Sequence, residues 1–222
     1  MKALFVLLLL LWNFSVVCAQ EQEEEAPFAP VTFEDPNLES ALRKTLKKAG
    51  GAIIRQDMGA LRSFTAVRMK IVNLSGMEFA RNIAELSIHS NEIVDLSPLA
   101  GLVRLRKLHL QSNSIQDLKP LSRLVNLTEL RLSTNRIEDL SPLANLVALS
   151  KLDLTGNQVA AVAPLSRMKR LHTLWLDRNR VGDVRPLAGL HGLKSLTLYR
   201  NRIPAVQKAF LTKVLSGTRI LF

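Results

Sequence analysis

The sequence predicts an α/β solenoid, in which short parallel strands line a concave face and turns or 3₁₀ segments form the convex face. A helix is expected to cap the N-terminal end. Three observations lead to this fold class: a period of 22 residues runs through most of the chain, leucines alternate with polar residues at the start of each unit, and most returns contain a proline. Units of this kind bury their leucines only against their neighbours, so they stack in one direction.

Residues 1–19 have the layout of a secretory signal peptide, because a cation precedes an apolar run that ends in small residues. We expect cleavage after Ala19 and therefore an exported protein, secreted or periplasmic. A retained membrane anchor is the competing interpretation, but the run is shorter than the ~20 apolar residues of a span. A lipoprotein attached through Cys18 is a weaker alternative, since Val17 stands where a small residue is expected.

Residues 20–30 are acidic, contain proline and lack periodicity, as is typical of a solvated linker. Residues 31–81 are expected to form a helical cap followed by a degenerate first repeat. Within the cap, Asp35 is a candidate N-cap and the next residue is a proline, which suits the first helical position. Apolar residues then recur at helical spacing, and we expect the glycine pair at residues 50–51 to stop the helix.

The degenerate repeat is recognised from the regular units that follow it. Apolar residues fill the same slots 22 positions upstream: Leu61, Phe64, Ala66, Met69, Ile71, Leu74 and Met77. Residues 82–213 then form six consecutive repeats with the skeleton LxxLxLxxNxI/VxxLxPL. The LxLxx part has the alternation of a short strand with one buried face. A proline in most returns argues against a long helix on the convex side.

One asparagine stands at the end of each strand pattern, always at the same place in the repeat. These residues are Asn91, Asn113, Asn135, Asn157, Asn179 and Asn201. An amide side chain has two donors and one acceptor, so it can satisfy the backbone groups that are freed where the chain leaves a strand. We therefore interpret all six as structural residues.

The sixth repeat ends differently, in "AFLTKVLSGTRILF". This tail predicts a helix followed by a closing strand at 218–222, within a C-terminal segment of residues 214–222. Taken together, the cap ("DPNLESALRKTL") and repeats such as "NEIVDLSPLAGL" resemble the internalin-like, 22-residue class of leucine-rich repeat proteins over residues 31–222. The resemblance implies a leucine-rich repeat solenoid and a function in binding, not catalysis.

The concave sheet is the expected surface for a protein ligand. Alternation places one column of side chains, running Glu85, Lys107, Glu129, Lys151, in an expected ladder of ion pairs along the solenoid. The next two columns contain large aromatic side chains at positions assigned to solvent. The candidate partner-binding residues are Arg131, Asp153, Trp175, Asp177 and Tyr199. Aromatic and arginine side chains are typical of interaction hot spots, although the aromatic rings could instead shield the sheet.

An excess of positive charge is confined to the C-terminal part of the chain. Residues 140–222 hold thirteen cations and three anions, whereas the two signs balance over residues 20–139. Four arginines stack at equivalent positions on either side of two asparagines, and we name them the arginine block: Arg178, Arg180, Arg200 and Arg202. As an alternative function, this block is a candidate anion-binding site for an acidic glycan, a lipid headgroup or nucleic acid. A solvated basic edge without a partner is the other interpretation.

Several functional classes receive no support from the sequence. A single cysteine permits neither a disulfide framework nor a cysteine-based zinc site. His89 and His109 lie on neighbouring predicted strands but lack a third ligand, so no metal site is predicted. No nucleophile elbow, phosphate loop or HExxH motif is present. We therefore expect a monomeric, non-catalytic protein that uses no cofactor and no small-molecule substrate.

Overall fold

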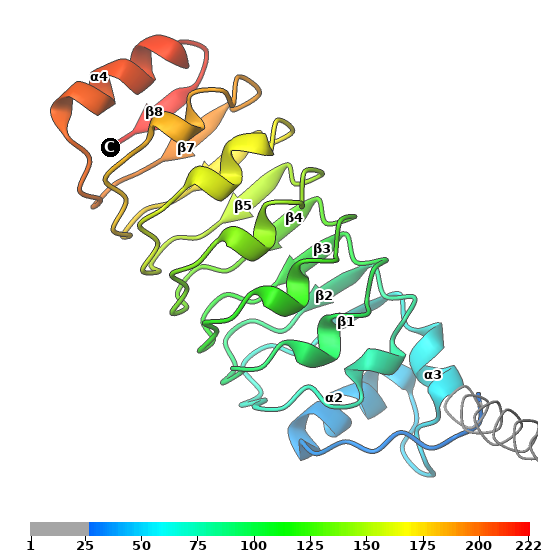
Figure 1. Ribbon diagram of the computed structural model, residues 1–222. Coiled ribbons are helices and arrows are strands. Elements are labelled where there is room, and N and C mark those ends of the chain that lie inside the picture. The colour runs from blue at the N-terminus through cyan, green and yellow to red at the C-terminus, as the bar shows by residue number, and fades with distance from the viewer. Residues whose placement is uncertain (1–26) are drawn as a thin grey trace, which may run out of the picture.

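A computed structural model describes residues 27–222, which form one elongated solenoid (Figure 1). The expected signal peptide and most of the acidic linker lie outside the described residues. Eight strands pair in parallel and in chain order, each next to its predecessor. The strands are β1 Ser63–Thr65, β2 Glu85–Ser87, β3 Lys107–His109, β4 Glu129–Arg131, β5 Lys151–Asp153, β6 Thr173–Trp175, β7 Ser195–Thr197 and β8 Arg219–Leu221.

Short 3₁₀ helices form the convex side opposite the sheet, and the predicted fold class is confirmed. In five of the six the proline of the repeat lies within the first turn, where its missing N–H is not required. The six segments are η1 Met77–Phe79, η2 Ser97–Leu99, η3 Lys119–Leu121, η4 Ser141–Leu143, η5 Ala163–Arg167 and η6 Arg185–Leu187.

The N-terminal cap consists of α2 Pro36–Leu46 and α3 Arg55–Ala60. Asp35 caps α2 with one carboxylate oxygen, at 2.9 and 3.1 Å from the amides of Asn37 and Leu38. Its other oxygen accepts hydrogen bonds from the backbone amides of Val72 and Asn73. This one side chain therefore joins the cap to the first repeat.

The end of α2 differs from the sequence expectation. The helix stops at Leu46, before the glycine pair, because Lys47 adopts the left-handed conformation with φ 54°. The amides that follow bond back to the carbonyl groups of Arg43 and Lys44. A non-glycine residue thus ends the helix, directly after Leu46.

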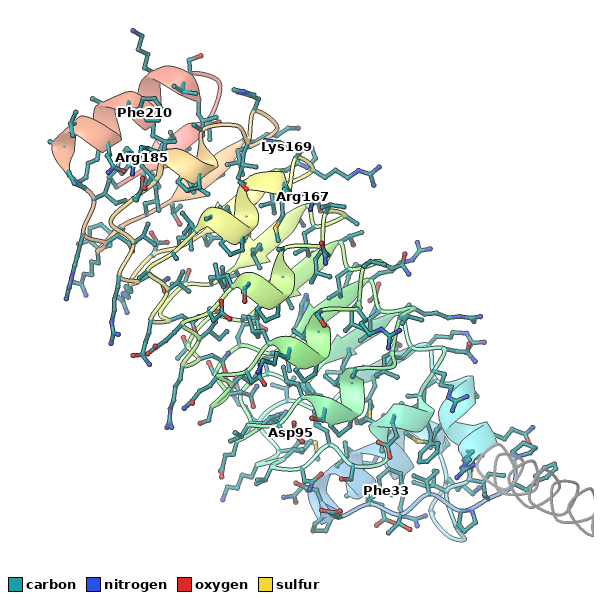
Figure 2. The ribbon with its side chains drawn as sticks, in the orientation of Figure 1. Phe33, Asp95, Arg167, Lys169, Arg185 and Phe210 are labelled. Carbon is teal, nitrogen blue, oxygen red and sulfur yellow. The ribbon has the colours of Figure 1, made fainter. Side chains whose placement is uncertain are left out.

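The C-terminal end contains a longer helix, α4 Ala205–Val214, followed by β8. Strand β8 pairs with β7 in register, with Leu221 beside Thr197. Helix α4 begins inside the sixth repeat and takes the place of its 3₁₀ segment. Phe33 and Phe210 are labelled at opposite ends of the molecule in Figure 2. No helix among residues 27–222 has the length and apolarity needed to cross a bilayer.

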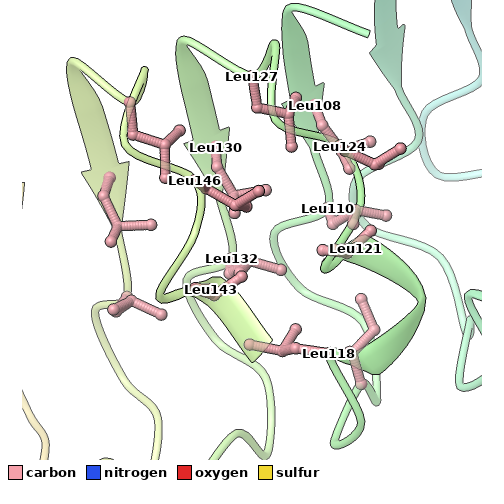
Figure 3. Packing of buried hydrophobic residues seen from close by; sticks show 14 of the residues in the cluster. Leu108, Leu110, Leu118, Leu121, Leu124, Leu127, Leu130, Leu132, Leu143 and Leu146 are labelled. Carbon is pink, nitrogen blue, oxygen red and sulfur yellow. The ribbon is translucent and has the colours of Figure 1, made fainter. Parts of the chain in front are cut away.

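The core is a continuous stack of aliphatic side chains between the sheet and the convex segments. Figure 3 shows successive layers of it, with Leu108 and Leu130 from adjacent strands facing leucines of the returns. Leu108, Leu130 and Leu152 are 0% exposed, as are the leucines of the 3₁₀ helices between them. Burial of a leucine side chain contributes about 2 kcal/mol. Stability is therefore distributed along the solenoid, one layer after another.

Candidate binding site on the concave sheet

The six asparagines make nearly the same contacts and hold the edge of the sheet rigid. In the Asn157 repeat, Nδ2 donates to the carbonyl oxygens of Leu132 and Leu154 at 3.0 and 2.9 Å. The Oδ1 atom accepts from the amide of Ile137 at 3.0 Å. Four of the six are buried, and the remaining two, Asn113 and Asn201, are half-buried. Each side chain thus ties its own repeat to the one before it.

The strand register brings three of the predicted partner-binding residues into one row. Arg131 pairs with Asp153, and Asp153 with Trp175, across β4, β5 and β6. The row continues through Thr197 to Leu221 on β8. Asp177 and Tyr199 lie in the neighbouring row, at the ends of the same strands. The five predicted residues therefore share the C-terminal part of the concave face.

The aromatic side chains differ in exposure. Tyr199 is 53% exposed, whereas Trp175 is half-buried, less open than its position in the strand pattern predicted. The structure adds Leu221, which is 46% exposed in the row of Trp175. Sequence reasoning missed it, although the predicted closing strand contained the signal. We call Trp175, Tyr199 and Leu221 the apolar patch of the concave face.

Arg131 is held by an acidic neighbour and is not a free guanidinium. Glu129 accepts hydrogen bonds from Arg131 at 2.6 and 2.7 Å and from His109 at 3.0 Å. Lys151 lies 3.5 Å from the same carboxylate, and Lys107 pairs with Glu85 at 2.7 Å. Glu129 is only 8% exposed. It therefore forms the centre of an ion-pair network on the sheet and orients Arg131.

This network lowers the pKa of the Glu129 carboxyl group. Burial opposes ionisation, but the hydrogen bond and charge of Arg131, the hydrogen bond from His109 and the charge of Lys151 outweigh it. The carboxylate form is therefore favoured in the folded protein.

Replacing Glu129 by glutamine is expected to reduce stability at neutral pH, and the reduction should shrink in acid. Because the folded pKa lies below the ordinary 4.5, the ion pairs contribute fully above that pH. Their contribution is lost as the pH falls through the folded pKa. Thermal unfolding of both proteins between about pH 7 and pH 3 measures this difference. Glu92→Gln, at an exposed position, is the control, and a Glu129→Gln loss of equal size at every pH would contradict the prediction.

The two aspartates of the candidate site bond within the sheet. Asp177 accepts a hydrogen bond from the amide of Tyr199 at 2.7 Å with one oxygen and from the Thr197 hydroxyl with the other. Asp153 accepts one from the amide of Thr155 at 3.0 Å. Asp177 consequently fixes the backbone that carries Tyr199, and an aromatic ring on a rigid base loses little entropy when it binds.

The arginine block lies just after the strands, but its four members are not equivalent. Arg178 and Arg200 both adopt the left-handed conformation, with φ 54° and 56°, where earlier repeats have serine, threonine or glycine. The Arg200 guanidinium lies over the Tyr199 ring at 5.4 Å. Arg180 donates to Gln158 at 2.7 Å and approaches Glu138 at 3.9 Å.

The remaining two side chains of the block, those of Arg178 and Arg202, form no ion pair or side-chain hydrogen bond with any residue that the structure describes. Both are exposed. Asp183 is the nearest acidic residue in sequence after Asp177, and it forms an ion pair with Arg185 at 2.7 Å. Hydrogen bonds from Arg185 lower the pKa of the Asp183 carboxyl group to about 2. Among the four arginines of the block, only Arg180 therefore has a carboxylate partner, Glu138 at 3.9 Å, within the described residues.

Replacing all four arginines of the block by glutamine is expected to shift elution from a heparin column to markedly lower salt. Contacts with a polyanion release counterions, so the salt dependence should also become shallower. The control has the same change in charge in the segments that precede β3, β4 and β6 in the chain, with the exposed Arg104, Arg106, Arg123 and Arg170 replaced by glutamine. Equal shifts for the two variants would show that net charge alone is responsible.

The two histidines on the concave face have separate partners. His89 Nδ1 lies 3.1 Å from the Ser90 hydroxyl, and His109 bonds Glu129. Partial burial, with the charges of His109 and Arg68, lowers the pKa of His89. Among residues 27–222 no group of three histidine, cysteine or acidic side chains is placed to hold a metal ion.

Comparisons with known proteins place this geometry among repeat proteins. A family model for leucine-rich repeats in two copies matches residues 81–123 and 125–167. No curated protein sequence matches the chain. The chain is similar to the crystal structure of an internalin, InlF, from Listeria monocytogenes, with 30% sequence identity and a TM-score of 0.82. The similarity covers 87% of this chain and 58% of the InlF chain.

Two further solved structures are similar. Internalin C2 from Listeria monocytogenes is 30% identical with a TM-score of 0.70, over 89% of this chain and 99% of that one. A leucine-rich repeat protein from Leptospira interrogans is 22% identical with a TM-score of 0.57, over 70% and 50% of the two chains, and it supports the fold alone.

Proposed function

Because this chain belongs to the internalin-like family of leucine-rich repeat proteins, we propose that it is an exported, non-catalytic module that binds a protein ligand through the C-terminal half of its concave sheet. The observation that carries the proposal is the apolar patch. Beyond a half-buried tryptophan on β6, an exposed tyrosine follows β7 and an exposed leucine lies on β8, on a surface that is otherwise polar. Such residues, next to arginine, form the centres of protein interfaces.

The surroundings of the apolar patch support this use. Asp177 holds the Tyr199 backbone, Glu129 orients Arg131, and the asparagines clamp the strand ends. A preorganised surface gives up little conformational freedom on binding. The concave sheet is also a continuous surface of eight parallel strands, along which an extended ligand can contact several repeats.

Affinity capture with immobilised residues 20–222 tests the proposal. The matched bait carries Trp175→Ala and Tyr199→Ala and is otherwise the same protein. Proteins retained by the first bait and absent from the second would be ligands of the apolar patch. If both baits retain the same proteins, the concave aromatic side chains are not the binding site. Export is tested separately, by N-terminal sequencing of the natural protein, which is expected to begin near Gln20.

A further inference from the structure

The helix that ends the solenoid has an apolar outer side, and this feature is not used by the concave site. Along α4, Val206 is 74% exposed and Phe210, one turn later, is 41% exposed. Ala209 and Lys213 are exposed on the same stripe, since residues three, four and seven apart share one side of a helix. Only Leu211 of this helix is buried. Figure 2 shows Phe210 on the last layer of the molecule.

The opposite end of the solenoid is built differently. Helix α2 buries Leu38, Ala41 and Leu42 against the first repeat. Its outward positions are polar, as Ser40 and Lys44 illustrate. Terminal layers of repeat proteins need such a polar outer side, because no further repeat covers them. Helix α4 has the same position at the other end without that polarity, so its outer side has the character of a contact surface.

Positive charge surrounds the exposed apolar residues of α4. Residues 184–222 contain seven lysines and arginines and no aspartate or glutamate. Lys208 stacks on the Phe222 ring at 5.3 Å, next to α4, and Lys213 and Arg219 are exposed. Among the described residues, none of these three cations forms an ion pair. Lys208 lies on the other side of α4 from the exposed stripe, because residues two apart on a helix do not share a side. We call Val206, Ala209, Phe210 and Lys213 of α4, with Arg219, the C-terminal end surface.

The exposed apolar residues and the surrounding positive charge indicate what kind of partner the C-terminal end surface contacts. A second copy of the chain is disfavoured, because two end surfaces would bring Lys213 and Arg219 of each copy together without an aspartate or glutamate between them. A short helix with phenylalanine and valine outward and Lys213 beside them suits the boundary between the headgroups and the acyl chains of a bilayer. Anionic headgroups would supply the missing negative charge.

We propose that the C-terminal end surface docks on an anionic membrane. Val206 and Phe210 enter the headgroup boundary, and Lys213 and Arg219 contact anionic headgroups. Because α4 is the last layer of the elongated molecule (Figure 1), the solenoid is anchored by its tip and the concave sheet stays open. The attachment is peripheral and reversible, since only two exposed side chains of one short helix insert.

Sedimentation with vesicles tests the proposal on residues 20–222. The protein is expected to bind phosphatidylcholine vesicles that contain about one-third phosphatidylglycerol and not vesicles of phosphatidylcholine alone. Val206→Ser with Phe210→Ser should weaken binding roughly tenfold, because the apolar insertion is lost while the charge is unchanged. The matched control is Val72→Ser with Val94→Ser, two valines that are 54% and 56% exposed elsewhere on the solenoid.

A charge variant and two outcomes complete the test. Lys213→Gln and Arg219→Gln together should weaken vesicle binding further, by roughly fivefold for each cation removed. The proposal would be overturned if vesicle binding survives the Val206 and Phe210 replacements but is lost when the four arginines of the arginine block are replaced by glutamine. That result would indicate simple polyanion binding. Failure to bind anionic vesicles, or a concentration-dependent dimer that the two serine replacements abolish, would also overturn the proposal. Binding of a protein ligand to the concave site should be unchanged in all of these variants, so failure of the membrane proposal can be distinguished from failure of the proposed function.

Discussion

Replacing Trp175 and Tyr199 by alanine is expected to weaken binding of the captured ligand by roughly 30-fold or more, because truncating hot-spot residues of this type costs about 2 kcal/mol or more. The two rings lie on neighbouring repeats, and their contacts with a ligand would be lost together. The dissociation constant, measured by calorimetry or surface plasmon resonance with each single variant and the double variant, gives the result.

The fold should survive this change. Neither side chain is in the buried core, and the Tyr199 amide still bonds Asp177 when the ring is removed. Circular dichroism and the unfolding midpoint should therefore be close to those of the parent. In the double variant Arg200 loses its cation–π contact with the Tyr199 ring. Tyr199→Phe is therefore a useful control, because it keeps the ring and this contact. An unchanged dissociation constant for the double variant would show that the aromatic side chains only shield the sheet.

Asn157→Ala is expected to lower the free energy of unfolding by about 2 kcal/mol. The change removes the hydrogen-bond partner of the Ile137 amide, in a place with little access to water. The carbonyl groups of Leu132 and Leu154 each lose one of two amide donors and keep those of Asn135 and Asn179. Each unsatisfied buried backbone group costs about 1 to 3 kcal/mol, partly relieved by local relaxation. Urea unfolding at equilibrium measures the loss.

Two other variants separate this effect from a general loss of asparagine. Asn157→Asp keeps an oxygen for the Ile137 amide but replaces both donors by an acceptor, so it should destabilise at least as much as alanine. Asn145 is exposed, and Asn145→Ala should leave stability within ~0.5 kcal/mol of the parent. If Asn157→Ala unfolds at the same urea concentration as the parent, the asparagine contacts do not contribute to stability.

The two surfaces proposed for binding are independent in their chemistry. The concave site depends on the apolar patch, whereas the C-terminal end surface depends on α4 and on cations without carboxylate partners. Variants at Trp175 should therefore leave vesicle binding unchanged, and variants at Phe210 should leave ligand affinity unchanged. Distant sites without shared contacts behave additively, so the combined variant should show both losses.

The sequence by itself determined the architecture of this protein. The strands, the buried leucines, the 3₁₀ returns and the position of each asparagine follow from a period of 22 residues. The reason is that every repeat packs against a neighbour with the same pattern, so the contacts that decide the fold are equivalent and can be recognised without coordinates. The family resemblance, which also depends on the repeated pattern, is confirmed by the comparisons.

Only the tertiary structure decided what the surface side chains do. Glu129 gathers side chains from three strands, Arg180 is bound by Gln158 of the preceding repeat, and Asp177 fixes the next strand. Leu221 joins the concave face through the pairing of β8, and the outer stripe of α4 is left uncovered. Contacts between surface side chains depend on the length and rotamer of each side chain and on its neighbours in adjacent repeats, which the spacing of residues in the sequence does not specify. Core positions depend only on burial, and the same positions are buried in successive repeats.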